Sequence, residues 1–279
     1  MSYSAEISRS TPTAFLFLID QSGSMGDVVS DGKTKAQFLA DALNRVLAVM
    51  IARSSKSEGV RNYFEIGVIG YGGKGIGNAL GGNFSSTLFN PIAEFEKYPL
   101  AVEDRWKKVS DGAGGLIEQT IKFPVWFMAE SSGGTPMCEA IGLAAQELAR
   151  WCDNHPDAYP PTVLHVTDGE SSDGDPEALA HQLTQISTND GQVLLFNLHT
   201  SNSGGAAIKF PSSESQMNDQ FAKLLFRMSS ALPQGVAAAA KEKGYEISSE
   251  SRGFLFNADA IDIVDFFDIG TRASTLLLR

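Results

Sequence analysis

Three hard-oxygen side chains follow one another on a short segment, Asp20-Gln-Ser22-Gly-Ser24, directly after the apolar run Phe15–Ile19. An aspartate and two hydroxyls at every second position, with a glycine between the hydroxyls, place several oxygen atoms on one tight loop. Oxygen ligands of this kind suit Mg²⁺, Mn²⁺ or Ca²⁺ rather than zinc or copper. The first question is which elements bring further ligands to this loop.

Two further segments carry matching side chains. Thr135 follows a Gly-Gly pair and precedes a helical pattern, and Asp168 follows the apolar run 162–167. Ligands of parallel sheets gather at the carboxyl ends of the strands, so Asp20 and Asp168 are expected to face one crevice, which Thr135 enters from the side. Two carboxylates and three hydroxyls favour Mg²⁺, which keeps part of its water shell, with Mn²⁺ or Ca²⁺ as alternatives.

The elements that position these residues alternate between short buried strands and amphipathic helices. Continuous apolar runs at 14–19, 162–167 and 193–198 predict central strands, and leucines and other apolar residues at helical spacing from 34 to 55 predict a long helix. This alternation predicts a three-layer, doubly wound α/β fold: a mostly parallel sheet with one antiparallel edge strand and helices on both faces.

The expected organisation is a single domain over residues 13–272, with a flexible arm at 1–12 and a tail at 273–279. Residues 71–130 read as an insertion, made of an edge hairpin and a long decorated loop, because the segment is rich in glycine and has no clear period. Apolar residues between Phe123 and Met128 are expected to pack in the core or a hairpin, with a hydrophobic rim beside the metal as the alternative.

Composition excludes several functions. The 279 residues carry a net charge of −11, which disfavours nucleic acid and anionic membrane surfaces as partners. The two cysteines, Cys138 and Cys152, lie too far apart on one expected helix for a disulfide. With no leader pattern and no apolar run of membrane length, the expected location is the cytoplasm.

The motifs Asp20-x-Ser22-x-Ser24, Thr135 before Pro-Met and Thr167-Asp168-Gly169 resemble the metal-ion-dependent adhesion site of von Willebrand factor A domains, in the bacterial intracellular type. The resemblance implies that Ser22, Ser24 and Thr135 are direct metal ligands, while Asp20 and Asp168 act mainly through bound water. It further implies an open coordination position that takes an Asp or Glu carboxylate from a partner protein.

Two functions from different classes follow. The preferred one is a non-catalytic protein-binding module that docks an intracellular partner, which the resemblance suggests is a MoxR-type AAA+ ATPase or a kinase–phosphatase system for stress or defence. The alternative is a metal-dependent hydrolase of phosphate esters, in which Mg²⁺ and carboxylates activate water. Against it, no Lys, Arg or His accompanies the motifs in sequence to stabilise a transferring phosphoryl group.

Overall fold

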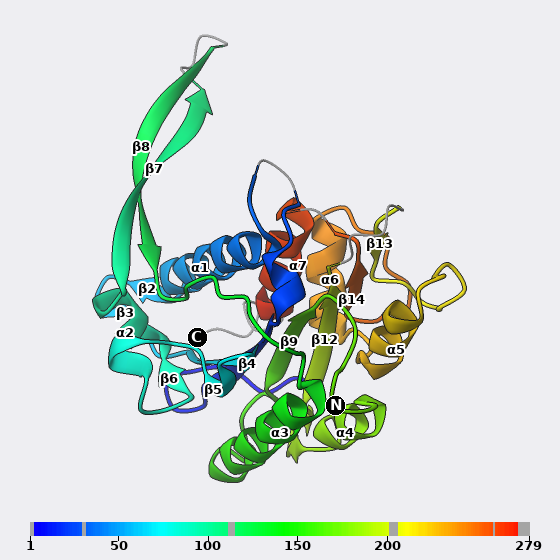
Figure 1. The fold of residues 1–279 in the computed structure, drawn as a ribbon. Helices are drawn as coiled ribbons and strands as arrows, with labels where there is room; N and C mark the ends of the chain where they lie inside the picture. Colours follow the sequence, from blue (N-terminus) through cyan, green and yellow to red (C-terminus); the bar gives the residue numbers. More distant parts are fainter. Residues whose placement is uncertain (1–2, 30–31, 111–114, 201–205, 259, 273–279) are drawn as a thin grey trace.

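The structure is a computed structural model that describes residues 3–29, 32–110, 115–200, 206–258 and 260–272. Its centre is one sheet with helices on both faces (Figure 1). In spatial order the strands are β13 (Ile208–Lys209), β14 (Phe254–Phe256), β12 (Leu194–His199), β9 (Thr162–Thr167), β1 (Thr13–Gln21), β4 (Phe64–Gly72) and β5 (Gly75–Asn78), and β6 (Asn90–Pro91) also pairs with β4. The strands from β14 to β4 are parallel, whereas β5 and the two-residue β13 run antiparallel at the two edges. The predicted mostly parallel sheet is confirmed.

Strand β1 lies at the middle of the sheet because its side chains are apolar on both faces. Alternate residues point to opposite sides of a strand, so the run divides between two cores. Phe15, Phe17 and Ile19 enter one core, and Ala14, Leu16 and Leu18 enter the other. This central position carries Asp20 to the carboxyl edge of the sheet, between β4 and β9.

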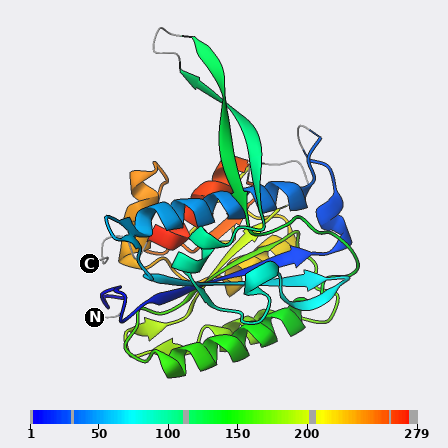
Figure 2. The ribbon, with the colours of Figure 1, turned by 90° about the vertical axis from the view of Figure 1, so that its left-hand side faces the viewer.

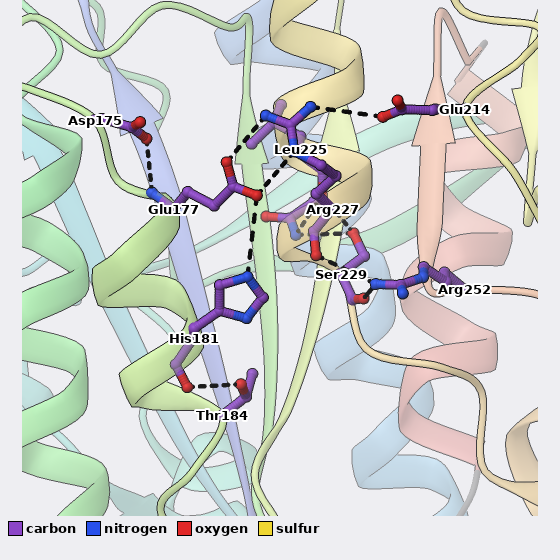
Figure 3. A network of polar contacts seen from close by, with 10 residues as sticks. Asp175, Glu177, His181, Thr184, Glu214, Leu225, Arg227, Ser229 and Arg252 are labelled. Atoms are coloured by element: carbon purple, nitrogen blue, oxygen red, sulfur yellow. Dashed lines mark hydrogen bonds and ion pairs between the residues drawn. The ribbon is translucent and has the colours of Figure 1, made fainter.

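Helices cover each core. One face is covered by α1 (Lys35–Ser54), α2 (Ile92–Lys97), α6 (Gln234–Glu242) and α7 (Ala260–Arg272), and the other by α3 (Met137–Asn154), α4 (Glu177–Leu183) and α5 (Gln220–Met228). Figure 2 shows α1 and α3 on opposite sides of the sheet. A surface ion pair braces α4 against α5, with the two guanidinium contacts from Arg227 to Glu177 at 2.8 and 3.0 Å (Figure 3).

A two-stranded ribbon stands out from the body on the side of α1 (Figures 1 and 2). It consists of β7 (Ala101–Ser110) and β8 (Leu116–Val125), paired antiparallel. At its root the Arg105 guanidinium reaches Asp41 of α1 at 2.7 Å and lies 3.6 Å from the centre of the Phe123 ring. Farther out, Trp106 is 72% exposed. The expected insertion therefore contains a ribbon where the sequence predicted a loop.

The remaining elements are short. They are the 3₁₀ turns η1 (Gly23–Gly26) and η2 (Gly82–Phe84) and the hairpins β2 (Ser55–Lys56) with β3 (Gly59–Val60) and β10 (Ser187–Thr188) with β11 (Gly191–Gln192).

The arm expected to be flexible over residues 1–12 lies against the body in its described part. Ile7 is fully buried in the core under α1, and the Tyr3 hydroxyl donates to the Gln192 carbonyl at 3.1 Å. Burial of Ile7 and Tyr3 stabilises the arm against the body. The many Ser and Thr residues around them led the sequence prediction to a flexible arm. The expected tail at 273–279 lies outside the described residues. None of the helices over the described ranges is long and apolar enough to cross a membrane.

Candidate metal site

Asp20 lies at the end of β1 and is 1% exposed. Its carboxylate accepts a hydrogen bond from the Ser22 N–H at 2.8 Å and one from the Thr167 hydroxyl at 2.7 Å. Burial raises the pKa of Asp20, and the nearby charge of Asp168 raises it further against these hydrogen bonds. Among the described residues, the hydrogen-bond donors given for Asp20 are thus neutral, and its charge lacks a direct cationic partner. A buried carboxylate in this state favours a bound cation.

Ser22 and Ser24 present their hydroxyls side by side on the turn η1, with the two Oγ atoms 3.1 Å apart. The buried Met25 side chain fixes the turn to the core. In an octahedral Mg²⁺ shell with metal–oxygen distances of 2.0–2.1 Å, adjacent ligands lie about 3.0 Å apart. The two hydroxyls therefore have the separation that two neighbouring Mg²⁺ ligands need.

The loop that carries Thr135 is tied to the Ser22 loop through the backbone. The Gly23 N–H donates to the Gly133 carbonyl at 2.9 Å, and the Ser132 N–H donates to the Gln21 carbonyl at 2.8 Å. On its other side, the Thr135 N–H donates to the Ser172 hydroxyl at 3.0 Å. These bonds place buried Thr135 at the same edge as Asp20.

Gly133 also lets the Thr135 loop approach the β4–β5 turn closely. Its φ is +70°, and a Cβ at this position would lie 2.3 Å from the Gly73 Cα in the β4–β5 turn. Both the left-handed backbone and the lack of space require glycine here.

Asp168 follows β9 and is held by two groups from distant parts of the chain. Its carboxylate is 3.0 Å from the ammonium of Lys35, which is the first residue of α1. Its carbonyl accepts a hydrogen bond from His199 Nε2 at 2.9 Å. Burial lowers the pKa of His199 and favours its neutral form, with the proton on Nε2. Gly169, with a φ of +132°, leaves room for the imidazole, because a Cβ there would lie 2.7 Å from Nε2.

The structure brings all five predicted site residues, Asp20, Ser22, Ser24, Thr135 and Asp168, to one edge of the sheet. Among the described residues there is no group of three or more His, Cys, Asp or Glu that could hold a metal. A metal here would depend on hydroxyls and two carboxylates, a hard-oxygen set that fits Mg²⁺.

Sequence reasoning missed Lys35 and His199, and it did not assign the Thr167 hydroxyl its contact with Asp20. Lys35 carried a readable signal. It directly follows the N-cap Thr34, and a cation at the start of a helix opposes the helix dipole, so another interaction must compensate. His199 directly follows the predicted strand 193–198, as Asp168 follows 162–167, but nothing in the sequence pairs its ring with the Asp168 carbonyl.

A cleft of about 440 Å³ is lined by Gln21, the residue before Ser22 in sequence, but by none of the five site residues. Its lining includes Ile76, Met128 and the ion pair Lys74–Glu130, whose charged atoms are 2.7 Å apart. Of the apolar residues between 123 and 128, Met128 alone is exposed, at 56%, while Phe123, Val125, Trp126 and Phe127 are buried. The cluster is therefore mainly core, and Met128 lines the cleft.

No family model matches the sequence, and no curated protein sequence matches it. Among solved structures, the pilus adhesin SpaC of Lactobacillus rhamnosus GG matches with a TM-score of 0.52 and 10% identity, over 98% of this chain and 31% of SpaC. At this identity the likeness shows a shared fold alone, and this chain spans less than a third of SpaC.

The type V pilus tip protein Mfa5 of Porphyromonas gingivalis also matches, with 17% identity over 58% of this chain. Its three N-terminal domains give a TM-score of 0.32 with 20% of that chain covered, and its vWF domain gives 0.30 with 39% covered.

Proposed function

We propose that this chain is a non-catalytic protein-binding module of the von Willebrand factor A type, which docks an acidic side chain of a partner through a Mg²⁺ ion. The observation that carries the proposal is buried Asp20, whose hydrogen-bond donors are neutral, beside the Ser22 and Ser24 hydroxyls at 3.1 Å from each other. Ser22, Ser24 and Thr135 would contact the ion directly, and Asp20 and Asp168 would hold its water ligands.

An ion bound mainly by neutral hydroxyls and water keeps most of its positive charge. A partner carboxylate that completes its shell would therefore gain a strong bond. The cleft lined by Gln21 and Met128 would receive residues that flank this carboxylate in the partner. The expected partner classes, an AAA+ ATPase or a kinase–phosphatase system in the cytoplasm, stay predictions.

The test is metal binding followed by partner binding. Calorimetric titration with Mg²⁺ should show one site in the wild type, and Thr135→Val, which removes one hydroxyl at nearly constant volume, should weaken it at least about tenfold. Thr184→Val is the matched control, because Thr184 lies at the end of α4 and bonds the His181 carbonyl. Absence of Mg²⁺ binding by the wild type would refute the metal site.

Partner docking is tested by affinity capture from the source cells, with Mg²⁺ or with EDTA. A genuine partner should be lost with EDTA and with Asp20→Ala, and should be retained by Thr184→Val. Partners captured equally under all these conditions would show that docking does not use the metal.

The hydrolase alternative gains one observation, since Lys35 places a cation 3.0 Å from Asp168. This ammonium is 5% exposed and is shared with Asp27, so it is poorly placed to reach a phosphoryl group. Metal-dependent turnover of a generic phosphate ester, abolished by Asp168→Asn, would favour the hydrolase over the binding module.

A further inference from the structure

Lys35 is a buried cation at the edge of the candidate metal site. Its side chain is 5% exposed, and its ammonium lies 3.0 Å from Asp168 and 3.6 Å from Asp27. The capping box of α1 fixes its position: the Thr34 hydroxyl accepts from the Gln37 N–H, and the Gln37 side chain accepts from the Thr34 N–H. The helix therefore begins in one register and directs its first side chain to the site.

This position is electrostatically unfavourable for a lysine. The N-terminus of a helix carries partial positive charge, and burial removes water from the ammonium. The compensation comes from Asp168, which follows β9, and from Asp27, which follows η1. Among the described residues, the Lys35 ammonium therefore pairs only with Asp168 and Asp27.

The two site carboxylates differ in this respect. Asp20 accepts hydrogen bonds from neutral groups, whereas Asp168 already has a cation in contact. A divalent ion that recruits Asp168 must share this carboxylate with Lys35 and must bind close to a like charge.

We propose that Lys35 is the internal counter-charge of the site: it holds Asp168 in place when no divalent ion is bound and lowers the affinity of the site for that ion. This inference rests on the proposed function. Asp27, about half exposed and 3.6 Å away, provides the ammonium with a second partner when Asp168 turns to the metal. Lys35 is in this sense a positioning residue that acts on the metal through Asp168.

The test compares Lys35→Met, which keeps the length of the side chain and removes its charge, with the wild type. Titration with Mn²⁺, followed by electron paramagnetic resonance, should show at least about tenfold tighter binding in Lys35→Met, because a repulsive charge is removed. Lys33→Met is the control: Lys33 is two residues away, half exposed, and pairs with Asp41 at 2.7 Å. Its affinity for Mn²⁺ should stay within about twofold of the wild type.

Folding gives a second readout. Without metal, Lys35→Met should melt below the wild type, because Asp168 loses its partner, and saturating Mn²⁺ should raise the melting temperature more in the variant than in the wild type. Lys35→Gln is a second neutral variant that can still donate a hydrogen bond to Asp168, which protects the test if Lys35→Met folds poorly.

The outcomes separate the two proposals. If the wild type binds Mn²⁺ and neither neutral variant binds it more tightly, the role of Lys35 is refuted while the metal site stands. If the wild type binds no Mn²⁺, the proposed function itself fails.

Discussion

Two groups of buried polar side chains lie next to each other in the sheet. They differ in whether their members are neutral and bond one another or carry charge. One is a chain from Tyr71 through His165 and Asn197 to Ser229, which links β4, β9, β12 and the end of α5. The other is the carboxyl edge around Asp20, which is the register partner of Tyr71 on the neighbouring strand.

The buried chain is neutral and closed. Asn197 Nδ2 donates to the Leu225 carbonyl at 3.2 Å and to the Ser229 hydroxyl at 2.9 Å, so its Oδ1 accepts from His165 Nδ1 at 2.7 Å. His165 Nε2 is then unprotonated and accepts from the Tyr71 hydroxyl at 2.7 Å. Each of these groups finds a neutral partner, and His165 is a core histidine whose two ring nitrogens are both hydrogen-bonded.

The carboxyl edge around Asp20, unlike the neutral chain, contains charged side chains. Asp20, Asp168 and Lys35 bring formal charges together, and the Ser22 and Ser24 hydroxyls bond each other beside them. A neutral chain in which every polar group has a partner stabilises the fold. Charged groups and hydroxyls gathered at an edge are instead typical of a ligand-binding site. Four measurements can break or sharpen this distinction.

The largest effect should come from opening the closed chain. Asn197→Ala leaves the buried His165 N–H without its acceptor and removes the amide donor to the Ser229 hydroxyl, which keeps its own bond to the Leu225 carbonyl. It should lower the free energy of unfolding by about 3 kcal/mol. Urea unfolding measures this loss. The control, Asn189→Ala, removes an exposed hydrogen bond to Asp157 and should cost less than about 1 kcal/mol. Equal losses would contradict a special role of the chain.

The pH dependence of stability should report His165. Burial lowers its pKa to about 4, from 6.5 in the unfolded chain. The unfolded state therefore binds the proton first, and the contribution of His165, complete above pH 6.5, is lost as the pH falls towards 4, by up to about 3 kcal/mol. His165→Gln should flatten this part of the stability curve measured by chemical unfolding. An unchanged slope would show that other groups dominate it.

Removal of divalent ions should have a moderate effect on stability, and only through the carboxyl edge around Asp20. With Mg²⁺ at 10 to 100 times its dissociation constant, the gain over EDTA is about 1.4 to 2.7 kcal/mol. Thermal unfolding of the wild type and of Asp20→Asn, each with Mg²⁺ and with EDTA, measures the gain. It should disappear in Asp20→Asn and persist in Asn189→Ala.

The smallest effect should come from a surface network that is neither closed nor tied to the site. Arg227 pairs with Glu177 and, at 3.5 Å, with Glu214 (Figure 3). These side chains are partly exposed, so Arg227→Met should cost about 0.5 kcal/mol, and less in high salt. Urea unfolding at two salt concentrations checks this. A loss as large as that of Asn197→Ala would mean that exposure does not separate the networks.

Much of the fold could be predicted because the central strands are continuous apolar runs. The run 162–167 became β9 with the same bounds, and the run 14–19 lies within β1. Since parallel strands end at one edge, the expected proximity of Asp20 and Asp168 followed from these runs alone. The antiparallel edge hairpin after β4 was also predicted, from its glycines.

The ribbon could not be predicted from the same signals. Alternation of apolar and polar residues arises when one face of a strand is buried, and on β7 and β8 the described side chains are mostly exposed on both faces. Lys35 was missed for a different reason. Its place after the N-cap Thr34 signals only that some interaction must compensate its charge, and the partner Asp168 lies 133 positions away, where no local pattern identifies it.

The root of the ribbon has a consequence for protein engineering. The Leu100 N–H donates to the Val125 carbonyl at 2.8 Å, so the chain leaves the body and returns to it at almost the same point. Phe123 and Val125 of β8 are buried at this root, but the part of the ribbon beyond them is a closed detour for the body, and a short turn could replace it. Asp41 would lose its contact with Arg105 but would keep Lys33. The contribution of the outer ribbon can therefore be measured by deleting it while the buried root is kept.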